Sequence, residues 1–194
     1  DATNKQLATN ESVGVLLSGG LDSSIITTIA SKYYKEKGIL LDTFSVDYKD
    51  YVGINKNVVI ANPNAPTGMT ISLNQIEEIV SSNKDYVVVI DEAYVDFGAD
   101  SAYNLTKKYD NLLVVMTYSK SRSLAGARLG FAIGNEEIIK DLEKIKFSTN
   151  PYSINRLTLL AGVAALESDN YYKENAKKII EVRDYTVKEL EKLG

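Results

Sequence analysis

Short apolar runs alternate along the chain with longer segments in which apolar residues recur every three or four positions. The short runs predict β-strands at 13–17, 39–46, Val58–Ala61, 86–90, 112–116 and 129–133. The longer segments predict helices at 22–35, from 73 after a Ser72 cap, at about 101–109, from an Asn135 cap to about 147, at 153–167 and at 171–193. Strands and helices therefore alternate through the whole sequence.

This alternation predicts an α/β fold, with a doubly wound, mainly parallel sheet and helices on both faces. The strand at 86–90 is apolar throughout, as expected for a strand that is buried on both faces of a parallel sheet. In such sheets, ligands bind at the carboxyl ends of the strands. The turns that follow the predicted strands are therefore the first places to look for a site.

Composition narrows the possible chemistry. The 194 residues include no cysteine and no histidine, which excludes disulfides, thiolate nucleophiles, histidine bases and ordinary zinc sites, so we expect no metal site. With Lys+Arg 22 against Asp+Glu 26, the net charge of −4 indicates no basic surface for nucleic acid. No apolar run is long enough to cross a membrane and no signal peptide opens the chain, so we expect a cytoplasmic protein without a membrane partner.

Three turn segments carry reactive side chains. They are NPNAPTG at 62–68, VIDEAYVDF at 89–97 and TYSKSRSLAGARLGF at 117–131. Small residues surround Lys120, which lets a bulky ring approach the backbone, and Arg128 offers a planar fork that suits phosphate. A lysine amine near a guanidinium and a buried carboxylate is what Schiff-base chemistry needs.

These segments strongly resemble the fold-type I pyridoxal-phosphate aminotransferases, and within them the histidinol-phosphate aminotransferase branch. The resemblance covers about 54–194 and implies a partial large domain, with the family's small domain missing. It implies that pyridoxal 5'-phosphate is the cofactor. It also implies that Lys120 is the catalytic residue, which forms the Schiff base with the cofactor and shuttles the proton of the substrate carbon.

The same resemblance implies the residues that hold the cofactor. Asp91 would pair with the pyridine nitrogen and Tyr94 would hydrogen-bond the phenolic oxygen of the ring. The cofactor phosphate would be held by Thr117, Ser119 and Arg128. The family commonly has an asparagine at the position of Ala65, and here Asn64, one residue earlier, is assigned its contact with the phenolic oxygen.

The N-terminal segment resembles a different family. SGGLDSS at 18–24 matches the phosphate loop of the ATP-pyrophosphatases, and FSVDY at 44–48 narrows the resemblance to the synthetase domain of glutamine-hydrolysing asparagine synthetase. The resemblance implies a phosphate against a helix N-terminus, held by Ser18, Gly19, Gly20, Asp22 and Ser23. The alternative is a glycine turn with no ligand. Because the rest of that synthetase domain is absent, we expect no ATP–Mg²⁺ chemistry.

Two units are therefore expected, an asparagine-synthetase-like βαβ segment at 1–53 and a partial aminotransferase large domain at 54–194. No linker separates them, so we predict one continuous sheet in a chimeric chain. The predicted function is an aminotransferase-like core, impaired or inactive because the small domain and its substrate-binding arginine are missing. The alternatives are a non-catalytic engineered chimera or fragment, and a phosphate- or nucleotide-binding module that uses the SGGLDSS loop. The expected partners are the amino-acid or phosphate substrate of the parent enzyme and a second copy of the chain in a homodimer.

Overall fold

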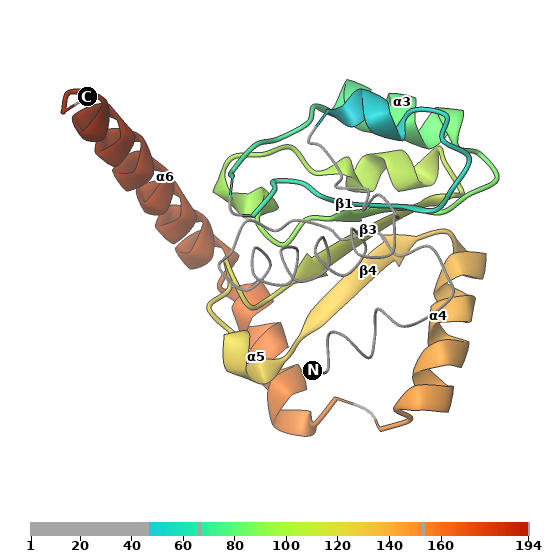
Figure 1. The fold of residues 1–194 in the computed structure, drawn as a ribbon. Coiled ribbons are helices and arrows are strands. Elements are labelled where there is room, and N and C mark those ends of the chain that lie inside the picture. The colour runs from blue at the N-terminus through green and yellow to red at the C-terminus, as the bar shows by residue number, and fades with distance from the viewer. Residues whose placement is uncertain (1–46, 66, 153, 194) are drawn as a thin grey trace, which may run out of the picture.

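The computed structural model describes residues 47–65, 67–152 and 154–193 (Figure 1). The predicted strands at 13–17 and 39–46, the helix at 22–35 and the SGGLDSS loop lie outside the described residues.

A four-stranded sheet lies at the centre of the described chain. Its strands are β1 (Val58–Ala61), β2 (Val88–Asp91), β3 (Leu112–Thr117) and β4 (Gly130–Gly134), in the order β1-β2-β3-β4. The first three strands are parallel, and β4 is antiparallel to β3. The chain can return beside β3 because only a short 3-10 helix, η4 (Ala125–Ala127), lies between β3 and β4, and no crossover helix is needed. The predicted α/β fold with a mainly parallel sheet is confirmed.

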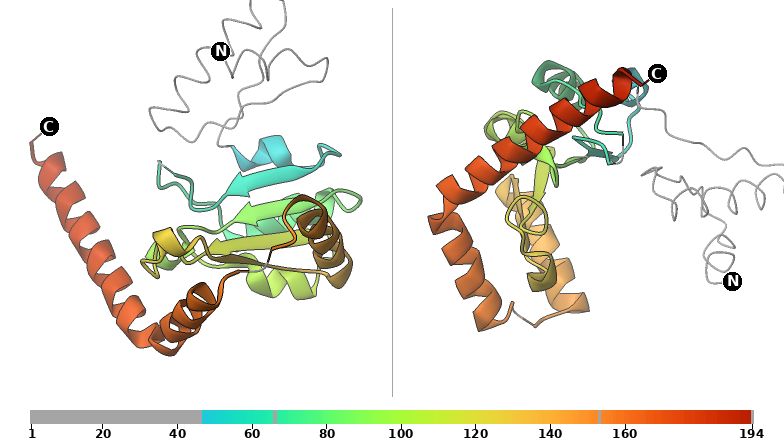
Figure 2. Two further views of the ribbon diagram at one scale, coloured as in Figure 1. Left: turned by 90° about the horizontal axis from the view of Figure 1, so that it is seen from below. Right: turned by 90° about the vertical axis from the view of Figure 1, so that its left-hand side faces the viewer.

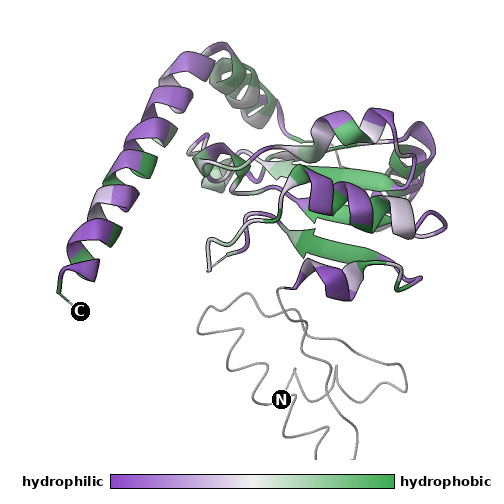
Figure 3. Ribbon diagram, turned by 90° about the horizontal axis from the view of Figure 1, so that it is seen from above, coloured by the Kyte–Doolittle hydropathy of each residue, from purple (hydrophilic) through white to green (hydrophobic). Residues whose placement is uncertain are grey.

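One face of the sheet carries the hydrophobic core. It packs against α3 (Leu73–Ser82), which lies over the sheet in Figure 1, and against the short 3-10 helix η1 (Tyr48–Tyr51). The buried apolar side chains that the sheet and α3 contribute to this interface are Val58, Val88, Ile90, Leu112 and Val114 from the strands and Ile76, Ile79 and Val80 from α3. Figure 3 shows the strands as the most apolar part of this layered body.

The start of α3 confirms the predicted cap. The backbone N–H of Ser72 donates to Gln75 Oε1 at 2.7 Å, and the N–H of Gln75 donates to Ser72 Oγ at 3.4 Å. This reciprocal pair satisfies two of the backbone donors that a helix N-terminus leaves free. Asn135 also caps α4 (Glu136–Thr149) as predicted, through its Oδ1 and the N–H of Glu137 at 2.8 Å.

Some predicted boundaries were wrong by a few residues, for identifiable reasons. β2 begins at Val88 instead of residue 86 because the N–H of Val87 is bound by the Asn57 side chain at 3.0 Å. The helix predicted at about 101–109 is a 3-10 helix, η3 (Ala102–Lys107), whose first amide donates to a carboxylate at the end of β2, that of Glu92.

Two helices close the described chain, α5 (Arg156–Glu167) and α6 (Asp169–Glu191). α5 begins at 156 instead of 153 because Asn155 caps it, accepting from the N–H of Thr158 at 2.9 Å. Ser168 is the only residue between the helices, and they meet there at a corner (Figure 2). From that corner α6 passes η2 (Val95–Phe97) and then extends beyond the sheet (Figure 1). Among the described residues, no helix combines the length and apolarity that a membrane span needs.

Candidate active site

The three motif segments leave the sheet at one edge. Ala61 pairs with Asp91, and Asp91 pairs with Val115, so β1, β2 and β3 end at nearly the same level. Because the strands are parallel, the segments that follow them emerge together. Thr117 lies two residues after Val115, so its side chain and that of Asp91 point to the same face of the sheet, opposite the core.

The loop after β1 is closed by a buried asparagine. Asn62 is only 1% exposed, and its Oδ1 accepts from the N–H of Ile71 at 2.9 Å while its Nδ2 donates to the Ile71 carbonyl at 3.2 Å. Its own N–H donates to the Asp91 carbonyl at 2.9 Å. The loop that carries Asn64 is therefore tied to the end of β2. Sequence reasoning missed Asn62, although its place directly after an apolar strand was a usable signal.

Asn64 itself is half-buried within this loop. Its Oδ1 accepts from the Thr67 hydroxyl at 2.9 Å, and its N–H donates to the Met69 carbonyl at 2.9 Å. These contacts hold the residue inside the loop and leave its side-chain amide nitrogen free of hydrogen bonds among the described residues.

Two adjacent carboxyl groups lie at the end of β2, on its last residue and on the residue after it, and they point to opposite faces of the sheet. Asp91 is half-buried, and its Oδ1 accepts from the N–H of Ala93 at 3.0 Å. Glu92 is buried on the core side, where it accepts from the Ser101 hydroxyl and from the N–H of Ala102 at 2.6 Å. Burial raises the pKa of Glu92 above its ordinary value, although both hydrogen bonds act in the other direction. Glu92 anchors η3 and so leaves Asp91 as the carboxylate that faces the edge.

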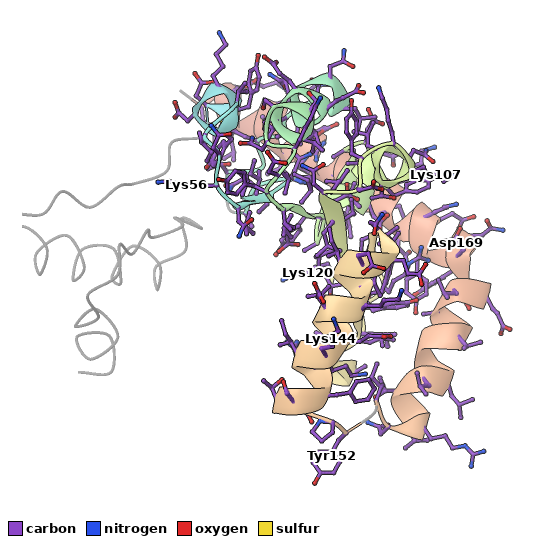
Figure 4. All side chains as sticks on the ribbon, turned by 90° about the vertical axis from the view of Figure 1, so that its right-hand side faces the viewer. Lys56, Lys107, Lys120, Lys144, Tyr152 and Asp169 are labelled. Carbon is purple, nitrogen blue, oxygen red and sulfur yellow. The ribbon has the colours of Figure 1, made fainter. Side chains whose placement is uncertain are left out.

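Lys120 and Tyr94 are brought together at this edge. The Lys120 ammonium nitrogen lies 4.9 Å from the centroid of the Tyr94 ring, within the range of a cation–π contact. Lys120 is exposed, and in Figure 4 its amine points away from the side of the molecule where Asp169 is labelled. The lysine and the tyrosine, 26 positions apart in the sequence, thus share one site.

The β3–β4 connection presents hydroxyl, amide and guanidinium groups. Thr117 Oγ1 accepts from the N–H of Ser119 at 3.0 Å and donates to the Leu129 carbonyl at 3.4 Å. Arg128 has a left-handed backbone (φ 52°) and an exposed side chain, with Nη1 donating to the Ala125 carbonyl at 3.3 Å. No carboxylate pairs with this guanidinium in the described part of the chain, so it is available to an anion.

The structure places the predicted residues of 54–194 on one edge but joins only some of them directly. Lys120 contacts Tyr94, and Thr117 contacts Ser119, whereas neither Asn64 nor Asp91 hydrogen-bonds to Lys120 within the described residues. A set of amine, phenol, carboxylate, hydroxyl and guanidinium groups around one edge fits a phosphorylated heteroaromatic ring. The predicted phosphate-loop residues Ser18, Gly19, Gly20, Asp22 and Ser23 lie outside the described residues.

Comparisons with known proteins agree with this geometry. The family described as "Aminotransferase class I and II" matches residues 26–194. The histidinol-phosphate aminotransferase of Brachyspira hyodysenteriae is 56% identical over 156 residues, which are 80% of this chain and 44% of that protein. The chain thus spans less than half the length of this relative. The match from residue 26 overlaps the segment that resembles the ATP-pyrophosphatases. That second resemblance and the chimeric origin stay predictions.

Solved structures show the same fold. The histidinol-phosphate aminotransferase of Clostridium acetobutylicum superposes with a TM-score of 0.68 at 26% identity, over 87% of this chain and 53% of that one. The histidinol-phosphate aminotransferase of Sinorhizobium meliloti, solved in complex with pyridoxal 5'-phosphate, gives a TM-score of 0.67 at 22% identity, over 94% of this chain and 51% of that one. With a family match over most of its length, a shared fold and a lysine at the sheet edge, the chain belongs to the class I and II aminotransferase family.

Proposed function

We propose that this chain is the cofactor-binding core of a pyridoxal-phosphate-dependent aminotransferase that acts on histidinol phosphate or a related amino-acid phosphate. The observation that carries the proposal is the Lys120 amine held over the Tyr94 ring at the edge where Asp91 ends β2. The 56% identity to the Brachyspira enzyme supports the substrate class. The family is pyridoxal-phosphate-dependent, and the Sinorhizobium structure supports this cofactor for the fold.

Each residue has a role in this proposal. When bound, the cofactor supplies an electron-withdrawing ring that acidifies the substrate carbon. Lys120 is the residue whose amine would hold the cofactor, and as a free amine in reach of the reacting atoms it would move a proton to and from that carbon. The Asp91 carboxylate keeps a proton on the ring nitrogen.

The remaining residues orient the ring. Tyr94 and Asn64 donate to its phenolic oxygen. The Thr117 and Ser119 hydroxyls and the Arg128 guanidinium bind the phosphate. The exposed Arg128 side chain, with no carboxylate partner among the described residues, suits this role because a planar guanidinium binds phosphate with two parallel hydrogen bonds.

Trapping the cofactor tests the proposal. The protein is incubated with pyridoxal 5'-phosphate, reduced with borohydride and digested, and mass spectrometry locates the adduct. We expect it on Lys120, and we expect Lys120→Ala to lose it. Lys144→Ala is the matched control, because Lys144 is an exposed lysine that pairs with Asp141 on α4, and this variant should keep the adduct. An adduct spread evenly over surface lysines in the wild-type protein would refute the cofactor site.

Turnover belongs to the whole protein, since the Brachyspira relative is more than twice as long as the stretch that it shares with this chain. We propose that residues 1–194 alone convert histidinol phosphate slowly or not at all while still binding the cofactor. A coupled assay of glutamate formation or consumption tests this. Turnover at a rate typical of enzymes, on the order of 10 per second, would contradict it.

We also propose that the chain self-associates. Large apolar side chains on α5 are exposed in the described structure, including Leu157 at 79% and Leu160 at 60%. Contiguous apolar surface of this kind is rare on monomeric proteins and marks an interface. A second copy of the chain is the occupant that we propose, as in the homodimer predicted from the family resemblance.

A further inference from the structure

The loop that carries Lys120 is fastened to the first turn of α6 by an arginine. Arg122 Nη2 lies 2.6 Å from Asp169 Oδ1, and the Arg122 guanidinium carbon lies 5.4 Å from the centroid of the Tyr172 ring. The Arg122 side chain is 17% exposed and the Asp169 side chain is 37% exposed, so the ion pair is shielded on its arginine side and open to water on its aspartate side. Asp169 is the first residue of α6 and also binds Lys173 Nζ at 2.6 Å. Both contacts hold its charged form and lower its pKa.

A second contact joins the two site loops to each other. The hydroxyl of Ser121, the residue after Lys120, donates to the carboxylate of Asp96, which lies two residues after Tyr94. η2, which contains Asp96, is in turn tied to α6, because Arg183 Nη1 donates to the Phe97 carbonyl at 3.1 Å.

These contacts surround a small cavity between the loops and α6. Its volume is about 150 Å³, and its lining includes Asp96, Ser121, Arg122, Tyr172, Lys173 and Ile180. The anchoring residues therefore closely follow the site residues in the same two short segments: Asp96 follows Tyr94, and Ser121 and Arg122 follow Lys120. Lys120 points away from the side of α6 in Figure 4, while Arg122, two residues further on, binds that helix.

Arg122 is poorly explained as a residue that only stabilises the fold. Its Nη1 is buried and has no hydrogen-bond partner in the described part of the chain. A buried donor without a partner costs free energy, and an ion pair that is partly open to water often gives little net stability. Departures from good packing chemistry concentrate at functional sites.

Lys120 depends on its neighbours for its position. Among the described residues, its amine lies over the Tyr94 ring and makes no hydrogen bond or ion pair. Two backbone hydrogen bonds shape the loop around it, from Ser123 N–H to the Lys120 carbonyl and from Leu124 N–H to the Tyr118 carbonyl, each at 3.0 Å. The first of these flanks Arg122 directly. The contacts of Arg122 with Asp169 and Tyr172 are what relate this loop directly to α6.

We propose that Arg122 is a positioning residue for Lys120: its ion pair with Asp169 holds the loop so that the lysine amine lies over Tyr94, and it couples that amine to α6. The link to the cofactor rests on the proposed function, whereas the link between Arg122 and the loop does not. A displacement of α6 then changes the position of Lys120 through Asp169 and Arg122.

Amide hydrogen exchange without cofactor tests whether Arg122 holds the loop that carries Lys120. In Arg122→Met and in Asp169→Asn, we expect the Ser123 and Leu124 amides to exchange about tenfold faster, because loss of a charge-assisted hydrogen bond favours local opening of the loop. The amides of β2 and β3 should keep their wild-type rates, which also shows that the variants are folded. Arg156→Met is the matched control, since Arg156 is an exposed arginine on α5, and it should leave the loop amides unchanged. Unchanged loop exchange in both variants would overturn the proposal.

Cofactor trapping tests whether the position of the loop affects the reaction of Lys120 with pyridoxal 5'-phosphate. The concentration of pyridoxal 5'-phosphate that half-saturates the borohydride-fixed adduct on Lys120 should rise about tenfold in Arg122→Met, the change expected when a charge-assisted hydrogen bond is lost. Arg122→Lys should recover part of this loss, because it keeps the charge. The double variant Arg122→Met with Asp169→Asn should resemble the single variants, since the two residues act through one contact.

The outcomes separate the two proposals. If the wild-type protein forms no Lys120 adduct, the proposed function fails and exchange alone decides the role of Arg122. If the wild-type protein forms the adduct and Arg122→Met forms it with equal affinity, Arg122 does not position the lysine. Additive effects in the double variant would also contradict the inference.

Discussion

Asn62 shows how one side chain determines the shape of a site loop. Its amide forms both hydrogen bonds with the Ile71 backbone and closes the loop that carries Asn64. Asn62→Ala leaves the N–H and the carbonyl of Ile71 without these partners, and we expect a loss of about 2 kcal/mol in the free energy of unfolding. Urea denaturation measures it. Asn64→Ala is the control, with an expected loss of about 0.5 kcal/mol because this amide is only half-buried. Equal losses would contradict this account of the loop.

Glu92 gives a residue-scale prediction about pH. Because burial raises its pKa, the folded protein binds this proton more tightly than the unfolded chain does. The stability contributed by Glu92 is therefore fully present below the ordinary value of 4.5 and is lost as the pH rises through the raised pKa. Glu92→Gln removes this dependence, so its stability relative to the wild-type protein should improve from acidic to neutral pH. Urea denaturation of both proteins at several pH values measures the difference, and a constant difference would refute the prediction.

At the scale of single elements, the sequence predicted the features that depend on neighbouring residues, but not those that depend on contacts between distant residues. The caps at Ser72 and Asn135 were predicted because cap and partner lie within three residues. The start of β2 depends on Asn57, 30 residues before Val87, and the 3-10 form of η3 depends on a carboxylate at the end of β2. Neither contact leaves a local pattern in the sequence.

The candidate site likewise contains residues that the sequence predicts and residues that it does not. Lys120, Tyr94 and Asp91 were assigned because they stand in motif segments that follow strands, and the sheet brings those segments to one edge. Arg122 and Asp169 lie 47 positions apart, in segments that show no shared pattern. Their ion pair follows from the path of α6, which periodicity alone does not predict.

β4 pairs with the end of β3, where the residues that we propose to bind the phosphate lie, and its first glycine allows a test of this pairing. Gly130 pairs with Thr117, and a Cβ at Gly130 would lie 2.8 Å from the Met116 carbonyl oxygen. A backbone oxygen within a sheet cannot move aside cheaply, so we expect Gly130→Ala to cost about 2 kcal/mol in the free energy of unfolding. Gly126→Ala is the matched control, since nothing lies within 4 Å of its added Cβ. Thermal and urea denaturation of both variants measure the costs, and equal stability would contradict the close approach of β3 and β4.

At the scale of the molecule, the two halves of the described chain differ in how they bury apolar surface. The sheet and α3 enclose a core whose side chains are almost inaccessible to water. α5 instead packs through its small residues, with Gly162 against Leu129, and leaves its leucines outside. Figure 3 shows apolar residues along α5 and a largely polar α6. An exposed apolar helix face of this kind is typical of an interaction surface.

The self-association that we propose should therefore depend on α5. Leu157 and Leu160 are one helical turn apart and lie on the same face. We expect the double variant Leu157→Lys with Leu160→Lys to raise the dissociation constant of the dimer at least about tenfold, since each copy would bury charge in place of a leucine. Sedimentation velocity over a range of concentrations measures this. Leu193→Lys is the control, because Leu193 is as exposed as Leu157 but lies at the far end of the described chain, beyond α6. Equal weakening by both changes would place the interface elsewhere, and a wild-type protein that stays monomeric at high concentration would exclude it, because the leucines of α5 would then remain in water.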